Sequence, residues 1–462
     1  MKQNMTAGPP ARLIFFFTLP LLAGNLFQQL YNMVDSVVVG RFVGPTALAA
    51  VGSAFPVVFL LSSLFLGLGQ GAMVLVSQFY GANDEKRLKA AVDTIYTALI
   101  VGGIPLSILG CLCVGPITGM MAIAPDALAE FRIYLLIMLG GLVGSLGYNA
   151  NSGILQGLGD SKTPVLFLVV ACGINIVLDL LFVVVFHWGV AGVAVATIIA
   201  QACSWVFGIL FINRRHPTLH ISPFCFRFDK AIFAQVIRIG VPIGIQQALF
   251  SLGAMLLVRL VNSFGSDFTA GYNAANKVDT IAFLPVQSFS MAVTTFVGQN
   301  MGAGKPGRVR QGSRAALWMS TAVCMGVALA LLAAGPWCMR LFSADAAVIG
   351  AGLAYLYRVL PFYFLFSLMY VLNGIMRGAG ETLVPLASSR PSRCVPGRPN
   401  PTAAIFPSRA SAASISGTKL SSRACSSRRA VRRTQLPIRS TVRRCRLSRP
   451  FSSKAHKISA CA

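Results

Sequence analysis

Ten apolar stretches of membrane-spanning length are the feature that most limits the folds open to this chain. A helix rises 1.5 Å per residue, so about 20 apolar residues cross a hydrocarbon core of ~30 Å. Only 11% of the residues are charged, and the mean hydropathy is +0.70, which fits no ordinary water-soluble domain. We therefore predict an all-α polytopic membrane protein with spans near residues 13–40, 46–79, 90–122, 131–157, 164–186, 189–212, 231–262, 268–298, 315–339 and 351–376.

Lysine and arginine gather in alternate loops, which predicts the orientation. One set of loops holds sixteen of them, whereas the opposite set holds only Arg41, Arg132 and Arg340. Because cytoplasmic loops carry the excess of basic residues, the N-terminus is expected in the cytoplasm and the protein in the cell (inner) membrane. The sixteen are Lys2, Arg12, Lys86, Arg87, Lys89, Lys162, Arg214, Arg215, Arg227, Lys230, Arg238, Lys305, Arg308, Arg310, Arg314 and Arg377.

An internal repeat divides the apolar region into two halves. The segment QFYGAN from Gln78 recurs as QNMGAG from Gln299, and GILQGLGDSKTP from Gly153 recurs as GIMRGAGETLVP from Gly374, both at an offset of 221 residues. A fixed offset of this kind indicates repeated structural units. With six spans a half, both halves enter the membrane from the same side, giving parallel repeats. We predict a six-helix lobe over 1–212, a cytoplasmic linker over 213–230 and a second lobe over 231–386.

The second lobe lacks its last two predicted spans. Where the repeat calls for them, residues 387–462 are rich in Arg, Ser and Pro and hold 17 of the 39 basic residues, the source of much of the +26 net charge. Such a composition predicts disorder. We interpret the change after about residue 386 as a truncation or a shifted reading frame; the alternative is a polybasic tail that binds anionic lipid. The charge does not indicate nucleic-acid binding, because the spans carry little of it.

Two carboxylates lie inside predicted spans, where an uncompensated charge is expensive. Asp35 is in the first span and Asp179 in the fifth. An Asp at a helix centre costs at least ~2.5 kcal/mol, so such residues usually face a protein interior or a wet cavity. Helix rise from Arg12 and Lys162 places them ~34 and ~25 Å into the membrane, both in the outer half. Asn175 lies one turn before Asp179, within hydrogen-bonding reach of that carboxylate.

A shared pocket for these acids would bind a small cation. Two acids in one low-dielectric cavity resist being ionised together, which favours uptake of H+. The surrounding oxygen atoms would also suit Na+, a hard cation, and the residues do not choose between the two. The other interpretation is structural, with Asp35 hydrated at a helix end and Asp179 satisfied by a neighbouring helix. No phosphate-binding GxxxxGK[ST] loop is found, so ATP is not the visible energy source. No enzymatic activity is expected.

The chain resembles the multidrug and toxic compound extrusion (MATE) family of cation-coupled antiporters over about residues 10–386. The resemblance is carried by Pro20, Asp35 and Gly44, by the GVPIGIQ stretch from Gly240, and by the repeated QxxGA and GxxP-type motifs. It implies two six-helix lobes around a central cavity and export of drugs or other amphipathic, often cationic, small molecules in exchange for H+ or Na+. A monomer embedded in membrane lipid, without cofactor, is expected.

The branch of that family with a first-lobe cation site implies specific residues here. Its pattern matches Asp35, Asn175 and Asp179, and by spacing alone Tyr134 and Thr197. Further residues could line the central cavity, namely Gln28, Gln29, Gln246, Arg259, Lys277 and Asp279. Two other interpretations stay open: a transport-inactive relic or membrane protein that only holds a ligand, and a flippase for lipid-linked sugars, which would need more basic residues for phosphates.

Overall fold

The computed structural model describes residues 4–121, 125–222, 226–264, 266–341 and 345–382. The tail over 387–462, with its predicted disorder, lies outside these ranges. The described residues form helices and no strands, which confirms the all-α prediction. The helices are α1 Pro10–Val38, α2 Pro45–Gly81, α3 Glu85–Leu112, α4 Val114–Met120, α5 Leu128–Gly140, α6 Leu142–Gly157, α7 Lys162–Leu180, α8 Gly189–Arg215, α9 Lys230–Asn262, α10 Ser266–Gly302, α11 Pro306–Arg340, α12 Ala346–Val359 and α13 Tyr363–Ala379.

The fourth predicted span of each half is broken in the middle. Within the described ranges nine helical segments are long and apolar enough to cross a membrane, and a tenth span results if α5 and α6, bent by 48°, count as one. The bend falls at Gly141, where a Cβ would lie 2.2 Å from Ile198 of α8, so only glycine allows α8 this close. In the second half a 3₁₀ turn that contains Pro361 separates α12 from α13, because proline offers no backbone donor to continue the α-helix.

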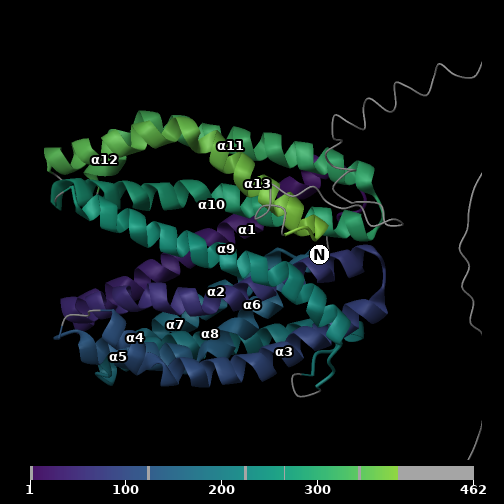
Figure 1. Ribbon diagram of the computed structural model, residues 1–462, viewed down its shortest axis with the longest axis horizontal. Helices are drawn as coiled ribbons and strands as arrows, with labels where there is room; N and C mark the ends of the chain where they lie inside the picture. The colour runs from purple at the N-terminus through teal and green to yellow at the C-terminus, as the bar shows by residue number, and fades with distance from the viewer. Residues whose placement is uncertain (1–3, 122–124, 223–225, 265, 342–344, 383–462) are drawn as a thin grey trace, which may run out of the picture. The chain divides into compact units, whose positions relative to one another are not determined.

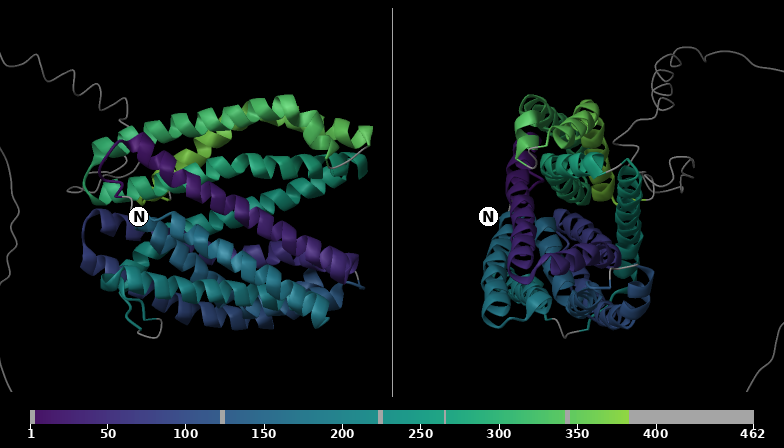
Figure 2. Two further views of the ribbon diagram at one scale, coloured as in Figure 1. Left: turned by 180° about the vertical axis from the view of Figure 1, so that it is seen from behind. Right: turned by 90° about the vertical axis from the view of Figure 1, so that its left-hand side faces the viewer.

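Two groups of helices carry the two halves of the sequence, and two long helices run between them. Helices α2–α8 lie together, α10–α13 form the second group, and α1 and α9 cross from one to the other (Figures 1 and 2). The crossing of α9 on α2 is close because glycines face each other. A Cβ on Gly67 would lie 2.4 Å from the carbonyl oxygen of Gly240, and one on Gly244 would lie 2.8 Å from Leu64 Cα.

The repeated QxxGA and GxxP-type motifs bind each other across the two halves. Gln78 Nε2 donates to the carbonyl of Gly378 at 3.1 Å, and its repeat partner Gln299 donates to the carbonyl of Gly157 at 3.0 Å. The glycines of the motifs allow the backbones to meet. A Cβ on Gly81 would lie 2.0 Å from the oxygen of Gln299. We call this reciprocal contact the latch, and the end of the helices that carries it the latch end.

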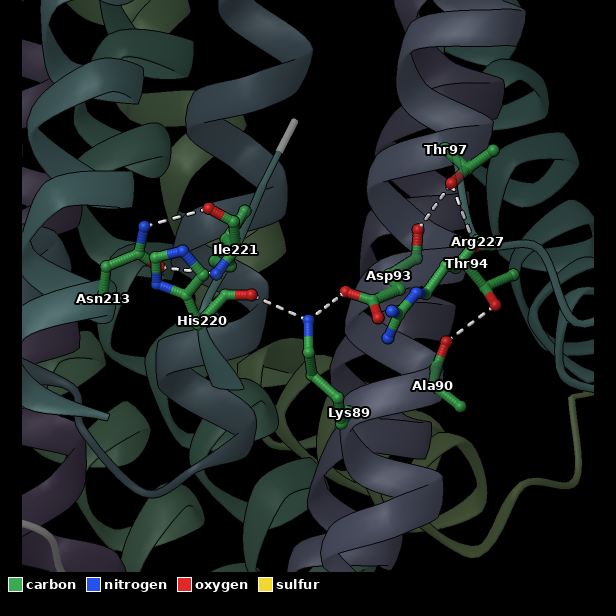
Figure 3. Close-up of polar contacts among 9 residues, drawn as sticks. All are labelled: Lys89, Ala90, Asp93, Thr94, Thr97, Asn213, His220, Ile221 and Arg227. Atoms are coloured by element: carbon green, nitrogen blue, oxygen red, sulfur yellow. Dashed lines mark hydrogen bonds and ion pairs between the residues drawn. The ribbon is translucent and has the colours of Figure 1, made fainter. Parts of the chain in front are cut away.

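The connection between α8 and α9 is fastened to α3 near the same end. Asn213 and Ile221 exchange hydrogen bonds of 2.9 and 2.6 Å, and Lys89 pairs with Asp93 and donates to the carbonyl of His220 at 2.7 Å (Figure 3). Thr97 Oγ1 donates to the carbonyl of Arg227 at 3.0 Å. The described parts of the predicted linker, residues 213–222 and 226–230, are therefore held along the first half.

The segment before α1 packs on the second half. Met5 is fully buried, its N–H donates to Gln299 Oε1 at 3.1 Å, and its carbonyl accepts from Asn300 Nδ2 at 3.0 Å. Arg308 donates to the carbonyls of Met5 and Gly8 at 3.3 and 2.8 Å. Helix α1 thus begins on the second half at the latch end and crosses to the first half, with Pro20 on the way.

Candidate functional site

The two membrane carboxylates meet around one amide. Asn175 is fully buried, and with its side-chain nitrogen facing the acids it donates to Asp35 Oδ1 at 2.8 Å and to Asp179 Oδ2 at 3.3 Å. This orientation follows from the hydrogen-bond network, since the opposite one would set the amide oxygen against two acceptors. The residues predicted from α1 and α7 therefore lie in one cluster, in which a single amide bridges both carboxylates.

Two polar atoms of this cluster are buried and accept or donate no hydrogen bond within the described residues. They are Asp179 Oδ1 and the hydroxyl of Tyr31, which lies one turn before Asp35 on the same face of α1. A buried polar group without a partner costs ~1 to 3 kcal/mol. An ion or proton held between the carboxylates would remove that cost, so the donor set fits a small hard cation.

Both helices continue into a π-helix that begins within four residues after their carboxylate. Residues Val39–Val43 continue α1, and Leu181–Val185 continue α7. Val39 and Val183 from these two segments are buried in one apolar cluster, which Tyr134 also contacts. Single π-helical turns often mark functional positions because the extra residue re-aims the side chains before it. Here they hold the ends of α1 and α7 together beyond the acids.

A cavity of about 420 Å³ opens beside Asp35. Its lining includes the predicted residues Gln28, Tyr134 and Thr197 as well as Tyr31, and comes from α1, α2 and α5–α8, so it lies within the first half. Asp35 is the one charged side chain in this lining, whereas Asn175 and Asp179 are fully buried and not part of it. The volume lies in the range of small-molecule sites, and the aromatic walls suit an amphipathic ligand.

The other residues predicted to line a cavity lie elsewhere. Lys277 is exposed, Gln29 is half-buried on α1, and Gln246 accepts a hydrogen bond from Arg377 at 2.9 Å. The Arg259 side chain lies outside the described residues. None of the predicted residues of α9 and α10 that the structure describes contributes to the cavity beside Asp35.

Asp279 forms a separate buried group in the second half. It is 4% exposed, and its carboxylate accepts a hydrogen bond from the hydroxyl of Tyr363 on α13. Tyr272 and Tyr355 stack edge to face nearby at 5.1 Å between ring centroids. In the described residues neither oxygen of this carboxylate is a buried acceptor without a partner, which distinguishes it from Asp179.

Sequence reasoning missed Tyr31 and misplaced Arg377. Tyr31 could have been found from its one-turn spacing to Asp35, since residues four apart share a helix face. Arg377 was counted with the loop cations, which is wrong: it lies within α13 and donates to Gln70 of α2 and Gln246 of α9, both at 2.9 Å. The repeat offset gave a signal, because Arg377 takes the place of Gln156 in the first half.

The polar cluster does not have the composition of a transition-metal site. In the described ranges no group of three or more His, Cys, Asp or Glu could hold a metal ion. Two carboxylates with the phenol oxygen of Tyr31 are instead hard oxygen ligands, which suit a hard cation or a proton.

This fold and this cluster of acids in the membrane define a multi-pass membrane transporter. A family model described as MatE matches residues 20–181 and again residues 242–390, one match for each half. The chain belongs to the MatE family, whose members are transporters and not enzymes.

Known proteins agree with this assignment. The chain is 30% identical over 385 residues to the probable multidrug resistance protein YoeA of Bacillus subtilis, covering 82% of this chain and 83% of that protein. It is 28% identical over 380 residues to the probable multidrug resistance protein YpnP of the same organism, with 82% and 85% covered. A solved structure of a multidrug resistance MATE family transporter in an outward-facing conformation shares the fold, with a TM-score of 0.76, 23% identity and coverage of 84% and 87%.

Proposed function

We propose that this protein is a secondary antiporter that exports amphipathic, cationic small molecules in exchange for H+ or Na+. The observation that carries the proposal is the Asn175 amide between Asp35 and Asp179, beside a cavity large enough for a drug-sized molecule. Asp35 belongs to both, since it is held by Asn175 and also lines the cavity. One carboxylate can therefore serve either the coupling ion or the substrate.

The coupling ion and the substrate compete for Asp35, and this competition produces the exchange. When a proton or Na+ occupies the carboxylate pair, the cavity loses its negative charge and a cationic substrate loses its attraction. When the ion leaves, the charge returns and the substrate binds. A one-for-one exchange of a monovalent ion for a monovalent cationic substrate moves no net charge, so the concentration gradient of the ion drives it, and each tenfold gradient supplies about 1.4 kcal/mol.

Helix α1 connects this site to the opposite half of the molecule. Ile14 and Phe17 are buried against α10 and α11, and Asn25 Nδ2 donates to Ser288 Oγ of α10 at 2.9 Å, whereas Tyr31 and Asp35 face the first-half cavity. Pro20 removes one backbone hydrogen bond of α1, which makes a bend there less costly. Occupation of Asp35 can therefore change how the two halves are joined.

The proposed direction and location follow from the same features. We propose that the protein lies in the inner membrane with its basic loops and its latch end on the cytoplasmic side. The carboxylates then lie toward the outer face, about 38 Å along α1 from Pro10 for Asp35. A cavity whose single lining charge is an acid favours cationic compounds over the phosphates of a lipid-linked sugar.

The test uses the purified full chain in liposomes loaded with ethidium. Release of ethidium should accelerate when a gradient of H+ or of Na+, tested one ion at a time, drives that ion into the liposomes. Asp35→Asn should respond to neither gradient. Arg358→Gln, an exposed change on α12, is the matched control. A wild-type protein that moves ethidium at the same rate with and without both gradients would contradict antiport.

A further inference from the structure

A second, smaller cavity lies between the two halves of the chain, at the level of Arg377. Its volume is about 120 Å³. Side chains from α2 and α6 form one side, and side chains from α10 and α13 form the other. It shares Leu66 and Asn149 with the lining of the larger cavity, so the two spaces adjoin.

The repeat accounts for how this cavity is built. Three of its residues on α2 have their repeat partners on α10 in the same lining, and Gln156 of α6 has its partner Arg377 of α13 there too. The cavity therefore lies where the two halves are related by their internal symmetry. The partners on α2 and α10 are Gly69 with Ser290, Gln70 with Met291, and Met73 with Thr294.

A single positive charge breaks that symmetry. The lining contains Arg377 and no acidic residue, and in the described residues the two ion pairs, Arg87 with Asp84 and Lys89 with Asp93, are both at the start of α3. The guanidinium donates to two neutral oxygens, those of Gln70 and Gln246. A guanidinium in an apolar bundle without a carboxylate partner is costly, and planar acids satisfy it best.

We infer that the Arg377 cavity binds an acidic group, a carboxylate or a phosphate, of the transported compound. The volume admits a group of that size but no entire drug-sized molecule, and Gln70, Gln156 and Ser152 offer further donors around it. The inference rests on the proposed function and narrows its substrate class. Zwitterionic amphipathic compounds, with a cationic part toward Asp35 and an acidic group at Arg377, belong to the substrates.

The test compares two probes that differ only in the acid: rhodamine B, which carries a free carboxylate, and its ethyl ester. Affinities are measured by fluorescence anisotropy with the full chain in phosphatidylcholine nanodiscs. Wild type should bind rhodamine B at least about tenfold more tightly than the ester, because charge-assisted hydrogen bonds are the strong ones. Equal affinities for wild type would overturn the inference without any variant.

Variants then assign the preference to the residue. Arg377→Gln, which restores the residue of the first half, should lose the preference for the acid and keep the affinity for the ester. Arg377→Lys should keep part of it, since lysine retains the charge without the fork of donors, and Arg358→Gln should change nothing. An Arg377→Gln protein that still prefers the acid as wild type does would overturn the inference.

Two further arms separate related outcomes. Phosphatidylglycerol added to the nanodiscs should leave the preference intact; if it abolishes the preference, a lipid headgroup occupies the cavity and the substrate assignment fails. The binding ratio is measured without any gradient, so it stands if antiport is disproved. Conversely, gradient-driven exchange of ethidium with no preference for rhodamine B would remove the Arg377 assignment and leave the antiporter intact.

Discussion

At the latch end the two halves of the chain are built from the same contacts, whereas their buried acids are held in different ways. Gln78 and Gln299 make equivalent hydrogen bonds to the carbonyls of Gly378 and Gly157. Farther along the helices, the first half holds two carboxylates on one amide, and the second half holds the single Asp279 with the hydroxyl of Tyr363.

This difference separates two tasks: joining the two halves, which both repeats share, and binding an ion. A reciprocal contact needs the same motif in each half, and both halves carry it. An oxygen without a hydrogen-bond donor is free to bind an ion; in the described residues Asp179 Oδ1 is buried without a donor, whereas neither oxygen of Asp279 is in that position. We therefore expect ion coupling in the first half and a structural role for the acid in the second.

The largest effect should come from removing a first-half acid. Asp35→Asn and Asp179→Asn should each slow gradient-driven ethidium exchange by about a hundredfold, because each removes one of the two carboxylates proposed to hold the coupling ion, and a hundredfold loss corresponds to about 2.7 kcal/mol. Asp279→Asn, as the comparison variant, should stay within a few-fold of wild type. If Asp279→Asn is as inactive as Asp35→Asn while still folded by thermal melting, the assignment of coupling to one half fails.

The glycines of the latch should give the next largest effect, and equally in both halves. A Cβ on Gly81 or Gly302 would lie 2.0 or 1.9 Å from a backbone oxygen of the other half. We expect Gly81→Ala and Gly302→Ala each to lower the free energy of unfolding by about 2 to 3 kcal/mol through overpacking. Melting temperatures check this.

Gly52→Ala is the matched control, since on α2 a Cβ at that position meets nothing within 4 Å. It should be neutral or slightly stabilising in a helix. A large loss for only one of the two latch glycines would mean that the contact is not reciprocal in energy.

Replacing the bridging amide should change ion binding more than folding. Asn175→Leu removes the two hydrogen bonds that stabilise the ion-free carboxylates, so the affinity for the coupling ion should rise about tenfold. The ion concentration that half-saturates ethidium exchange measures it. Asn149→Leu is the control, because Asn149 also lines the cavity but, among the described residues, donates to the carbonyl of Ser145 and to neither carboxylate. An unchanged half-saturation in Asn175→Leu would leave the bridge without a role in coupling.

The smallest effect is expected at Tyr363. Tyr363→Phe removes the donor to Asp279 and should lower the free energy of unfolding by about 1 to 2 kcal/mol, with exchange near the wild-type rate. Tyr357→Phe, at an exposed position on α12, should leave the melting temperature unchanged. If Tyr363→Phe also abolished ion-driven ethidium exchange, the second half would be a coupling site as well.

Much of this arrangement could be predicted from the sequence. Apolar segments of spanning length gave the helices, and a constant offset gave the two halves. The cost of a carboxylate in lipid pointed to Asp35 and Asp179, and one-turn spacing pointed to Asn175. Each of these signals can be read within one segment of the sequence, or from the single offset of 221 residues between the two halves.

Other features depend on contacts between distant segments and could not be predicted in this way. The reciprocal binding of the two motifs requires the packing of α2 on α10, although both motifs were visible. The break between α5 and α6 at Gly141 depends on Ile198 of α8. Arg377 near a helix end looks like any loop cation until the α2 and α9 side chains that face it are placed.

The seating of Met5 has a practical consequence for labelling experiments. Because residues 4–8 are bound to Gln299, Asn300 and Arg308, a fluorophore on this segment would report directly on whether the motifs of the two halves are apart. For the same reason, a bulky affinity tag inserted there would keep the latch from closing. The purification tag should therefore be placed elsewhere in the chain.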